Sequence, residues 1–202
     1  LLVRNLRASF PEQFIGGIQD SPFAQTQCPD LILSEHSTWK RIYLHRMKHS
    51  EICIASTGLH QSSGWKIAEY LAAGRAIVSE PLCYEVPGTI QAGENYLTYT
   101  SADGCIEQIR TLLAHPEQIL QMGQRNRAYY DTWLRPDQIV TKALEQAKEN
   151  GFEQVELGVF EDNPRARHLY EKLGFQEQGR TLRAFRLKDG TYRDEIQMVK
   201  FL

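Results

Sequence analysis

The residues with the clearest chemical potential lie between Ser56 and Leu82, in the segment STGLHQSSGWKIAEYLAAGRAIVSEPL. A strand ends just before a turn of small polar residues, and a helix begins directly after it. This order places free backbone N–H groups and the positive helix end above a sheet, where a diphosphate binds. Lys66, one turn into the helix, can reach a phosphate. Glu69 lies three residues farther along the same face and can accept hydrogen bonds from both hydroxyls of a ribose.

Each of these features also has a purely structural interpretation. A helix start such as Ser62-Ser63-Gly64 is often a simple cap. Lys66 and Glu69, at positions i and i+3, can form a surface ion pair worth roughly 0.2–0.5 kcal/mol. The pattern alone therefore leaves both interpretations open.

The surrounding elements predict an α/β protein with a Rossmann-like parallel sheet and flanking helices. Apolar spacing indicates helices over 2–10, 39–47, 67–71 and 106–113, strands over 14–18, 52–55, 76–78 and 96–100, and a helical stretch to residue 150 broken near Pro136. Strands that alternate with helices imply right-handed crossovers between parallel strands. The turn after residue 55 then lies at the carboxyl edge of the sheet.

From Gly151 the sequence pattern changes, and it predicts a βαββ tail. We expect a strand over 155–160, a helix over 164–173 and a hairpin with strands over 183–187 and 195–201. Asp189-Gly190 favours a tight primed turn between the last two strands. No low-complexity linker separates the two parts, so we expect them to meet inside a helix between residues 140 and 148.

Composition excludes several classes of function. The chain carries 23 basic and 25 acidic side chains without a run of like charges, which argues against nucleic-acid binding. No apolar stretch is long enough for a membrane span, and no leader pattern is present, so we expect a cytoplasmic protein. The four cysteines are widely spaced, and no cluster of potential ligands indicates a metal.

WKIAEYLAAGRAIVSEPL, YEVPG and ENYLTYTSADGCIEQI resemble the donor-binding half of GT-B glycosyltransferases, particularly bacterial group 1 types, and the resemblance covers residues 1–142. It implies a nucleotide-sugar-binding lobe that uses a nucleotide diphosphate sugar as donor for transfer to an acceptor hydroxyl, with no metal and no covalently bound cofactor. The donor-binding residues that it implies are His60, Gln61, Ser62, Ser63, Gly64, Lys66 and Glu69.

Two glutamates eight positions apart contact the donor in retaining members of that fold. Glu69 matches the second by position, whereas Gln61 stands where the first would fall. Gln61 can hydrogen-bond a sugar hydroxyl but carries no negative charge. The family's acceptor-binding half lies outside the resemblance, so we expect the module to be incomplete as it stands.

Residues 143–202 resemble the C-terminal half of GNAT superfamily N-acetyltransferases through ALEQAKENGFEQVELGVFEDNPRARHLYEKLGFQEQGR. This resemblance implies acetyl-CoA as ligand, with Asn163 contacting the coenzyme and Tyr170 placed to protonate the departing thiolate. The family's pyrophosphate loop has no counterpart before Ala143. Tyr170 also fits a plain packing role, as an amphipathic core residue.

Three functional hypotheses follow from the two resemblances. The first is a glycosyltransferase-type module over residues 1–142, and the second is an N-acetyltransferase fragment over residues 143–202. The third is a catalytically inert chimera of two half-folds. Two incomplete folds would expose apolar surface, so we also expect copies of the chain to form a homo-oligomer.

Overall fold

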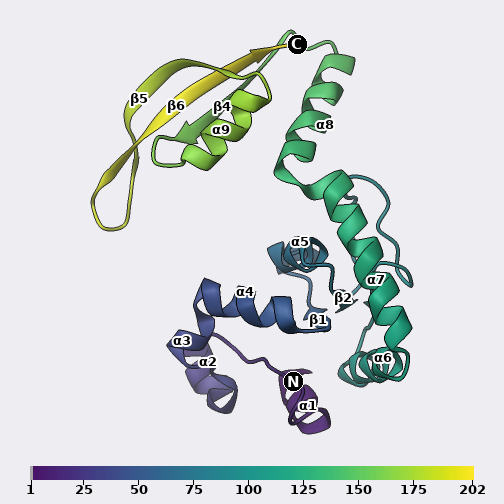
Figure 1. The fold of residues 1–202 in the computed structure, drawn as a ribbon. Helices are drawn as coiled ribbons and strands as arrows, with labels where there is room; N and C mark the ends of the chain where they lie inside the picture. The colour runs from purple at the N-terminus through teal and green to yellow at the C-terminus, as the bar shows by residue number, and fades with distance from the viewer. Residues whose placement is uncertain (1) are drawn as a thin grey trace. The chain divides into compact units, whose positions relative to one another are not determined.

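The structure is a computed structural model that describes residues 2–202, and it divides into two compact units at residues 134 and 135 (Figure 1). Each unit has its own sheet, and the mixed α/β class predicted from the sequence is confirmed. The boundary between the two resemblances, predicted after residue 142, falls inside a helix and stays a prediction. No helix in residues 2–202 has the length and apolar character needed to cross a membrane.

The first unit alternates helices and short strands. Its elements are α1 (Leu2–Ser9), α2 (Pro22–Gln27), α3 (Glu35–Thr38), α4 (Lys40–His49), β1 (Ile52–Ala55), α5 (Trp65–Ala72), β2 (Ala76–Ser79), β3 (Leu97–Thr98), α6 (Ala102–Ala114) and α7 (Pro116–Tyr129), with a π-helical turn over Tyr130–Leu134. The expected strand over 14–18 is wrong. Only an isolated parallel bridge between Ile18 and Ile32 forms there, because the Gly16-Gly17 pair inside the run weakens a strand.

The three strands of this unit form a parallel sheet in the order β1-β2-β3. Cys53 pairs with Ile77, and Val78 pairs with Leu97. Ile77 and Val78 are both fully buried although successive side chains point to opposite faces. Helices must therefore cover both faces, as the Rossmann-like prediction requires.

Each face of the sheet has its own core. On the Val78 face, Leu6 of α1, Leu112 of α6 and Met122 of α7 pack together. On the Ile77 face, residues of α4, α5 and α7 do so, namely Met47, Ile67, Tyr70, Leu71 and Tyr129. The helix α7 thus contributes to both cores and fixes the sheet between them.

Helices α5 and α7 approach closely at two glycines. Gly74 ends α5 with a φ of +61°, the left-handed conformation that lets a helix stop. A Cβ added at Gly123 of α7 would lie 2.5 Å from the Gly74 carbonyl oxygen. The position of α5, and with it the polar turn before α5, therefore depends on this contact.

The second unit contains α8 (Pro136–Glu149), β4 (Gln154–Phe160), α9 (Pro164–Lys172), β5 (Gln176–Arg186) and β6 (Tyr192–Phe201). The strands are antiparallel in the order β4-β6-β5, and the predicted βαββ tail is confirmed. Val159, Phe175 and Met198 form the centre of its core. Residues of α8 and α9 pack on them, including Leu144, Val140, Ala166 and Tyr170.

The hairpin of β5 and β6 differs from its prediction in length and turn. The strand β5 begins at Gln176, seven residues earlier than expected, because a polar strand at a sheet edge lacks an apolar signal. The expected primed turn is wrong. Of the loop residues only Gly190 has a positive φ, of 87°, and Leu187 N–H donates to the Thr191 carbonyl at 2.8 Å. This closes a three-residue loop with a left-handed glycine last.

Candidate functional site

The carboxyl ends of β1, β2 and β3 lie at one edge of the parallel sheet, and their loops carry the polar residues of the first unit. At the end of β1, the Tyr99 hydroxyl donates a 3.0 Å hydrogen bond to the Ala55 carbonyl. Just beyond it, one oxygen of Glu80 accepts hydrogen bonds from the N–H and the hydroxyl of Thr57, at 2.7 and 2.8 Å. These contacts fasten the end of β1 and the start of the polar turn to the residues that follow β3 and β2.

Sequence reasoning did not identify Glu80 as part of this edge. The only available signal was its place directly after the buried strand β2, where a charged residue is unusual without a partner. Its partner Thr57 lies 23 residues earlier in the chain, and only the parallel pairing of β1 and β2 brings the two together.

The polar turn itself is held in an uncommon backbone conformation. His60 and Gln61 have φ values of 56° and 60°, in the left-handed region, within a short 3-10 turn over Leu59–Gln61. Gly58 N–H donates to the Ser62 carbonyl at 2.8 Å, and the Tyr84 hydroxyl donates to the His60 carbonyl at 2.9 Å. Such strained residues cost about 1–3 kcal/mol each and are frequent at ligand sites.

Helix α5 begins directly after this turn with an uncapped N-terminus. Gly64 is the N-cap residue, and no side chain accepts a hydrogen bond from the first turn. Ser62 and Ser63 are exposed, so the simple-cap interpretation of the Ser-Ser-Gly sequence does not describe this helix start. Its N–H groups and positive dipole end are available to an anion.

Glu69 is oriented by a residue from a different helix. Its carboxylate forms an ion pair with the ammonium group of Lys40 at the start of α4, and its side chain is 23% exposed. The surface pair between Lys66 and Glu69 that the spacing allowed is absent from residues 2–202, where Lys66 is exposed. Burial and then the Glu69 carboxylate raise the pKa of Tyr43. One glutamate oxygen thus faces a cation, and the tyrosine beside it stays protonated.

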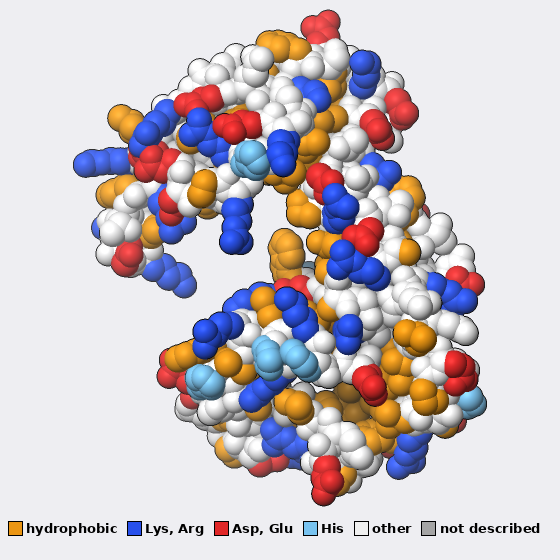
Figure 2. Space-filling view, viewed as in Figure 1, with side chains coloured by type: hydrophobic (Ala, Val, Ile, Leu, Met, Phe, Trp, Pro, Cys, Tyr) orange, Lys and Arg blue, Asp and Glu red, His pale blue; other side chains and the backbone are white. Residues whose placement is uncertain are grey.

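Basic side chains gather on α4 beside this carboxylate. The exposed residues of the helix include Lys40, Arg41, His45, Lys48 and His49. Figure 2 shows Lys, Arg and His side chains together over this helix. The structure therefore brings all seven predicted donor-binding residues, His60–Gly64, Lys66 and Glu69, into one turn and the helix that follows it, next to a cationic helix.

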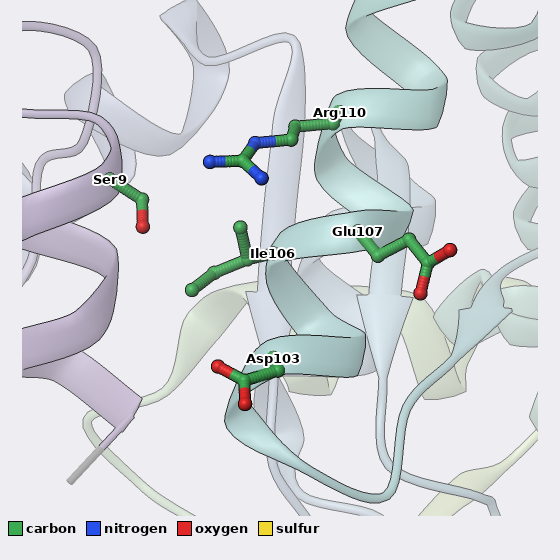
Figure 3. A pocket seen from close by; sticks show the side chains of 5 residues that line it. All are labelled: Ser9, Asp103, Ile106, Glu107 and Arg110. Atoms are coloured by element: carbon green, nitrogen blue, oxygen red, sulfur yellow. The ribbon is translucent and has the colours of Figure 1, made fainter.

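Two open hollows of the first unit lie outside this turn. One, of about 470 Å³, lies between α1 and α6 and is lined by Ser9, Asp103, Ile106, Glu107 and Arg110. Figure 3 shows Arg110 and Ile106 extending toward the side of Ser9, whereas Glu107 points away. The other, of about 330 Å³, is lined by residues of the loop after β2, including Leu82, Tyr84, Val86, Ile90 and Tyr96. Tyr84 links the second hollow to the turn through its bond to His60.

In the second unit the two predicted coenzyme residues lie on one helix. Asn163 is the N-cap of α9, and its side-chain oxygen accepts a 3.2 Å hydrogen bond from the Ala166 N–H. Tyr170 is half-buried, with its ring 5.7 Å from that of Phe175. The two residues lie seven positions apart, or about 10 Å along the helix axis. They could contact only well-separated parts of one extended ligand.

Among residues 2–202, no group of three or more His, Cys, Asp or Glu side chains is arranged to hold a metal ion.

Two family models match the chain. The model described as glycosyl transferase-like matches residues 27–145, more than half of the sequence. The model described as the acetyltransferase (GNAT) family matches residues 137–175. Both resemblances inferred from the sequence are thereby confirmed. No curated protein matches the chain.

N-acetyltransferases are among the solved structures that are similar to part of the chain. An acetyltransferase of the GNAT family from Streptococcus pneumoniae is 30% identical over 33% of this chain and 40% of its own, with a TM-score of 0.32. Spermidine N-acetyltransferase from Vibrio cholerae, in complex with CoA and spermine, is 30% identical over 32% of this chain and 38% of its own, with a TM-score of 0.31. The chain thus spans about two fifths of the length of these structures.

Proposed function

The chain belongs to the glycosyl transferase-like family, and from this membership we propose that its first unit binds a nucleotide diphosphate sugar as donor for transfer to an acceptor hydroxyl. The observation that carries the proposal is the uncapped N-terminus of α5 at the carboxyl edge of the sheet, with Glu69 one turn along the same helix. An anion-binding end and a ribose-binding carboxylate on one helix match the two polar parts of a nucleotide diphosphate.

The roles follow from the chemistry of each residue. The N–H groups at the start of α5, with Ser62 and Ser63, would hydrogen-bond the diphosphate, and Lys66 would neutralise part of its charge. Glu69 would accept hydrogen bonds from the ribose hydroxyls, and Lys40 would orient its carboxylate through their ion pair. His60 and Gln61, in the strained turn, would contact the sugar. Glu80 would support the turn through Thr57 without touching the donor.

Gln61 stands at the position of the first glutamate in the pattern of retaining enzymes, and this difference limits what the residue can do in sugar transfer. Gln61 can donate and accept hydrogen bonds, but it cannot stabilise a developing positive charge as a carboxylate does. We therefore assign Gln61 a role in orienting the sugar and not in charge stabilisation.

Calorimetric titration of the full chain with UDP and with GDP tests this function. We expect one nucleotide to bind, and we expect Glu69→Ala to weaken binding roughly thirtyfold, because it removes hydrogen bonds to a charged acceptor worth about 2 kcal/mol. Lys40→Ala, which breaks the ion pair but keeps the carboxylate, should weaken binding far less. Glu107→Ala, which removes a carboxylate of α6 in the same unit, is the matched control and should have no effect.

A result in which Lys40→Ala is as damaging as Glu69→Ala would show that the pair acts only in holding α4 to α5. Absence of heat with both nucleotides, from a chain shown to be folded, would contradict the proposed function.

A second candidate function concerns the second unit. The match of residues 137–175 to the GNAT family includes both Asn163 and Tyr170, and it favours binding of acetyl-CoA by this unit. The N-terminus of α9, which Asn163 caps, would approach the coenzyme, and Tyr170 would lie near its sulfur. Titration with acetyl-CoA, repeated with Asn163→Ala, tests this. Loss of binding on substitution supports it, whereas no heat from the folded chain removes it.

A further inference from the structure

The strand β4 forms one edge of the sheet in the second unit, and that edge is long and regular. It pairs with β6 without a break over seven residues, from Gln154 opposite Phe201 to Phe160 opposite Glu195. On its other side, no strand of residues 2–202 pairs with it (Figure 1). A row of backbone N–H and C=O groups therefore faces outward along the whole strand.

The two edges of this sheet are built differently. The strand β5, at the other edge, has two register shifts, a left-handed residue at Arg183 with φ 52°, and a further arginine at Arg186. Bulges and positive charges are the devices by which proteins prevent edge-to-edge pairing. The sequence of β4, QVELGVF, has neither a proline nor a lysine, and Glu156 is its only charge. The β5 edge is protected, whereas the β4 edge is open to another strand.

The order of residues in β4 is complementary to itself. Val155, Leu157 and Val159 of β4 face the core of their own unit. If a second β4 strand pairs with this one, the two cores lie on the same side of the joined sheet only when core-facing residues of one copy stand opposite core-facing residues of the other. An antiparallel pair centred on Leu157 satisfies this condition and uses the whole strand. It places Glu156 opposite Gly158, whereas the register centred on Glu156 would oppose two like charges, which destabilises a sheet.

We propose that the β4 edge binds β4 of a second copy of this chain, antiparallel and with Leu157 opposite Leu157. This contact joins two three-stranded sheets into one sheet of six strands, and each core stays covered by its own α8 and α9. The interface involves none of the residues assigned to nucleotide binding. Its test is therefore independent of the proposed function.

The proposed register makes a charge test possible. Gln154 of one copy lies opposite Phe160 of the other, and the two-fold symmetry creates this pair twice. The double substitution Gln154→Lys with Phe160→Lys opposes lysines in both pairs, whereas Gln154→Lys with Phe160→Glu opposes lysine and glutamate. The two variants differ at residue 160 alone. Opposite charges across two strands stabilise a sheet and like charges destabilise it.

Sedimentation equilibrium of the full chain over a range of concentrations measures the dimer dissociation constant. We expect the unsubstituted chain to dimerise, and the variant with opposed lysines to dissociate at least tenfold more readily than the variant with lysine and glutamate. Tenfold corresponds to about 1.4 kcal/mol. Gln178→Lys, at the exposed β5 edge, is the matched control and should leave the dissociation constant unchanged. Circular dichroism checks that each variant is folded.

Two outcomes would overturn the proposal. The first is a chain that stays monomeric at all concentrations, and the second is an equal dissociation constant for the two double variants. If the chain is monomeric and its binding of acetyl-CoA is lost with opposed lysines, the edge belongs to the coenzyme.

Discussion

Asn126 of α7 offers the sharpest test of how the first unit is held together. Its side chain is fully buried, and it donates to the carbonyls of Arg75 and Asn95 at 2.7 and 2.9 Å. Its oxygen accepts a 3.1 Å hydrogen bond from the Asn95 amide. It therefore ties the end of α5 and the loop before β3 to α7.

Asn126→Ala removes all three hydrogen bonds and leaves two carbonyls and one amide without a partner. With a net value of about 1 kcal/mol for each bond and a further penalty for the unsatisfied buried groups, we expect a loss of roughly 3–5 kcal/mol. This is a large part of the typical stability of a domain, about 5–15 kcal/mol.

Urea unfolding followed by tryptophan fluorescence measures the loss of stability of the first unit. All three tryptophans, Trp39, Trp65 and Trp133, lie in that unit. With a slope of about 2 kcal/mol per molar urea, the midpoint should fall by roughly 2 M. Gln124→Ala, at an exposed position of the same helix, should change it little. A loss below about 1 kcal/mol for Asn126→Ala would refute this account of the buried network.

Three further predictions concern the same unit; the same fluorescence assay measures each change in stability, and hydrogen exchange is added for the second. Gly123→Ala should destabilise the first unit by about 1–3 kcal/mol, because the new methyl group would meet the Gly74 carbonyl, and this clash should outweigh the helix preference of alanine. Unchanged or increased stability would show that α5 and α7 can move apart. Glu80→Ala should cost about 1–2 kcal/mol and speed hydrogen exchange at the Thr57 amide; unaltered exchange would mean that the carboxylate does not fasten the turn. Burial raises the pKa of Tyr70 from 10 to about 12, so folding favours its neutral form. Its contribution should be complete below pH 10 and fall as the pH rises toward 12, by up to about 1.4 kcal/mol per pH unit, and a flat profile would contradict this.

The sequence predicts the parts of the fold in which apolar spacing is strong. The strands β1 and β2 and the helix after Gly64 are predicted because buried parallel strands are short apolar runs separated by helices. Only the second half of β5 is predicted, because Gln176 to Thr181 include no large hydrophobic side chain and therefore show no alternation of apolar and polar residues. The strand expected over 14–18 fails because its apolar run contains Gly16 and Gly17, so that only an isolated bridge at Ile18 forms.

The candidate site is predicted to the extent that it is local. His60 to Glu69 follow one another in the chain, so a strand, a turn and a helix suffice to bring them together. The contacts that hold the site in place are not local: Lys40 reaches Glu69 across 29 positions, and Glu80 reaches Thr57, just before the turn, across 23. Such pairs depend on how helices and strands pack, and neither residue type nor spacing indicates them.

Nuclear magnetic resonance titration with UDP and GDP tests the central claim most directly, because it locates a bound nucleotide on the chain. The account predicts that the largest shifts fall on the backbone amides from Thr57 to Lys66 and near Glu69. Shifts confined to residues after 134, or no shifts at millimolar nucleotide in a folded chain, would contradict it.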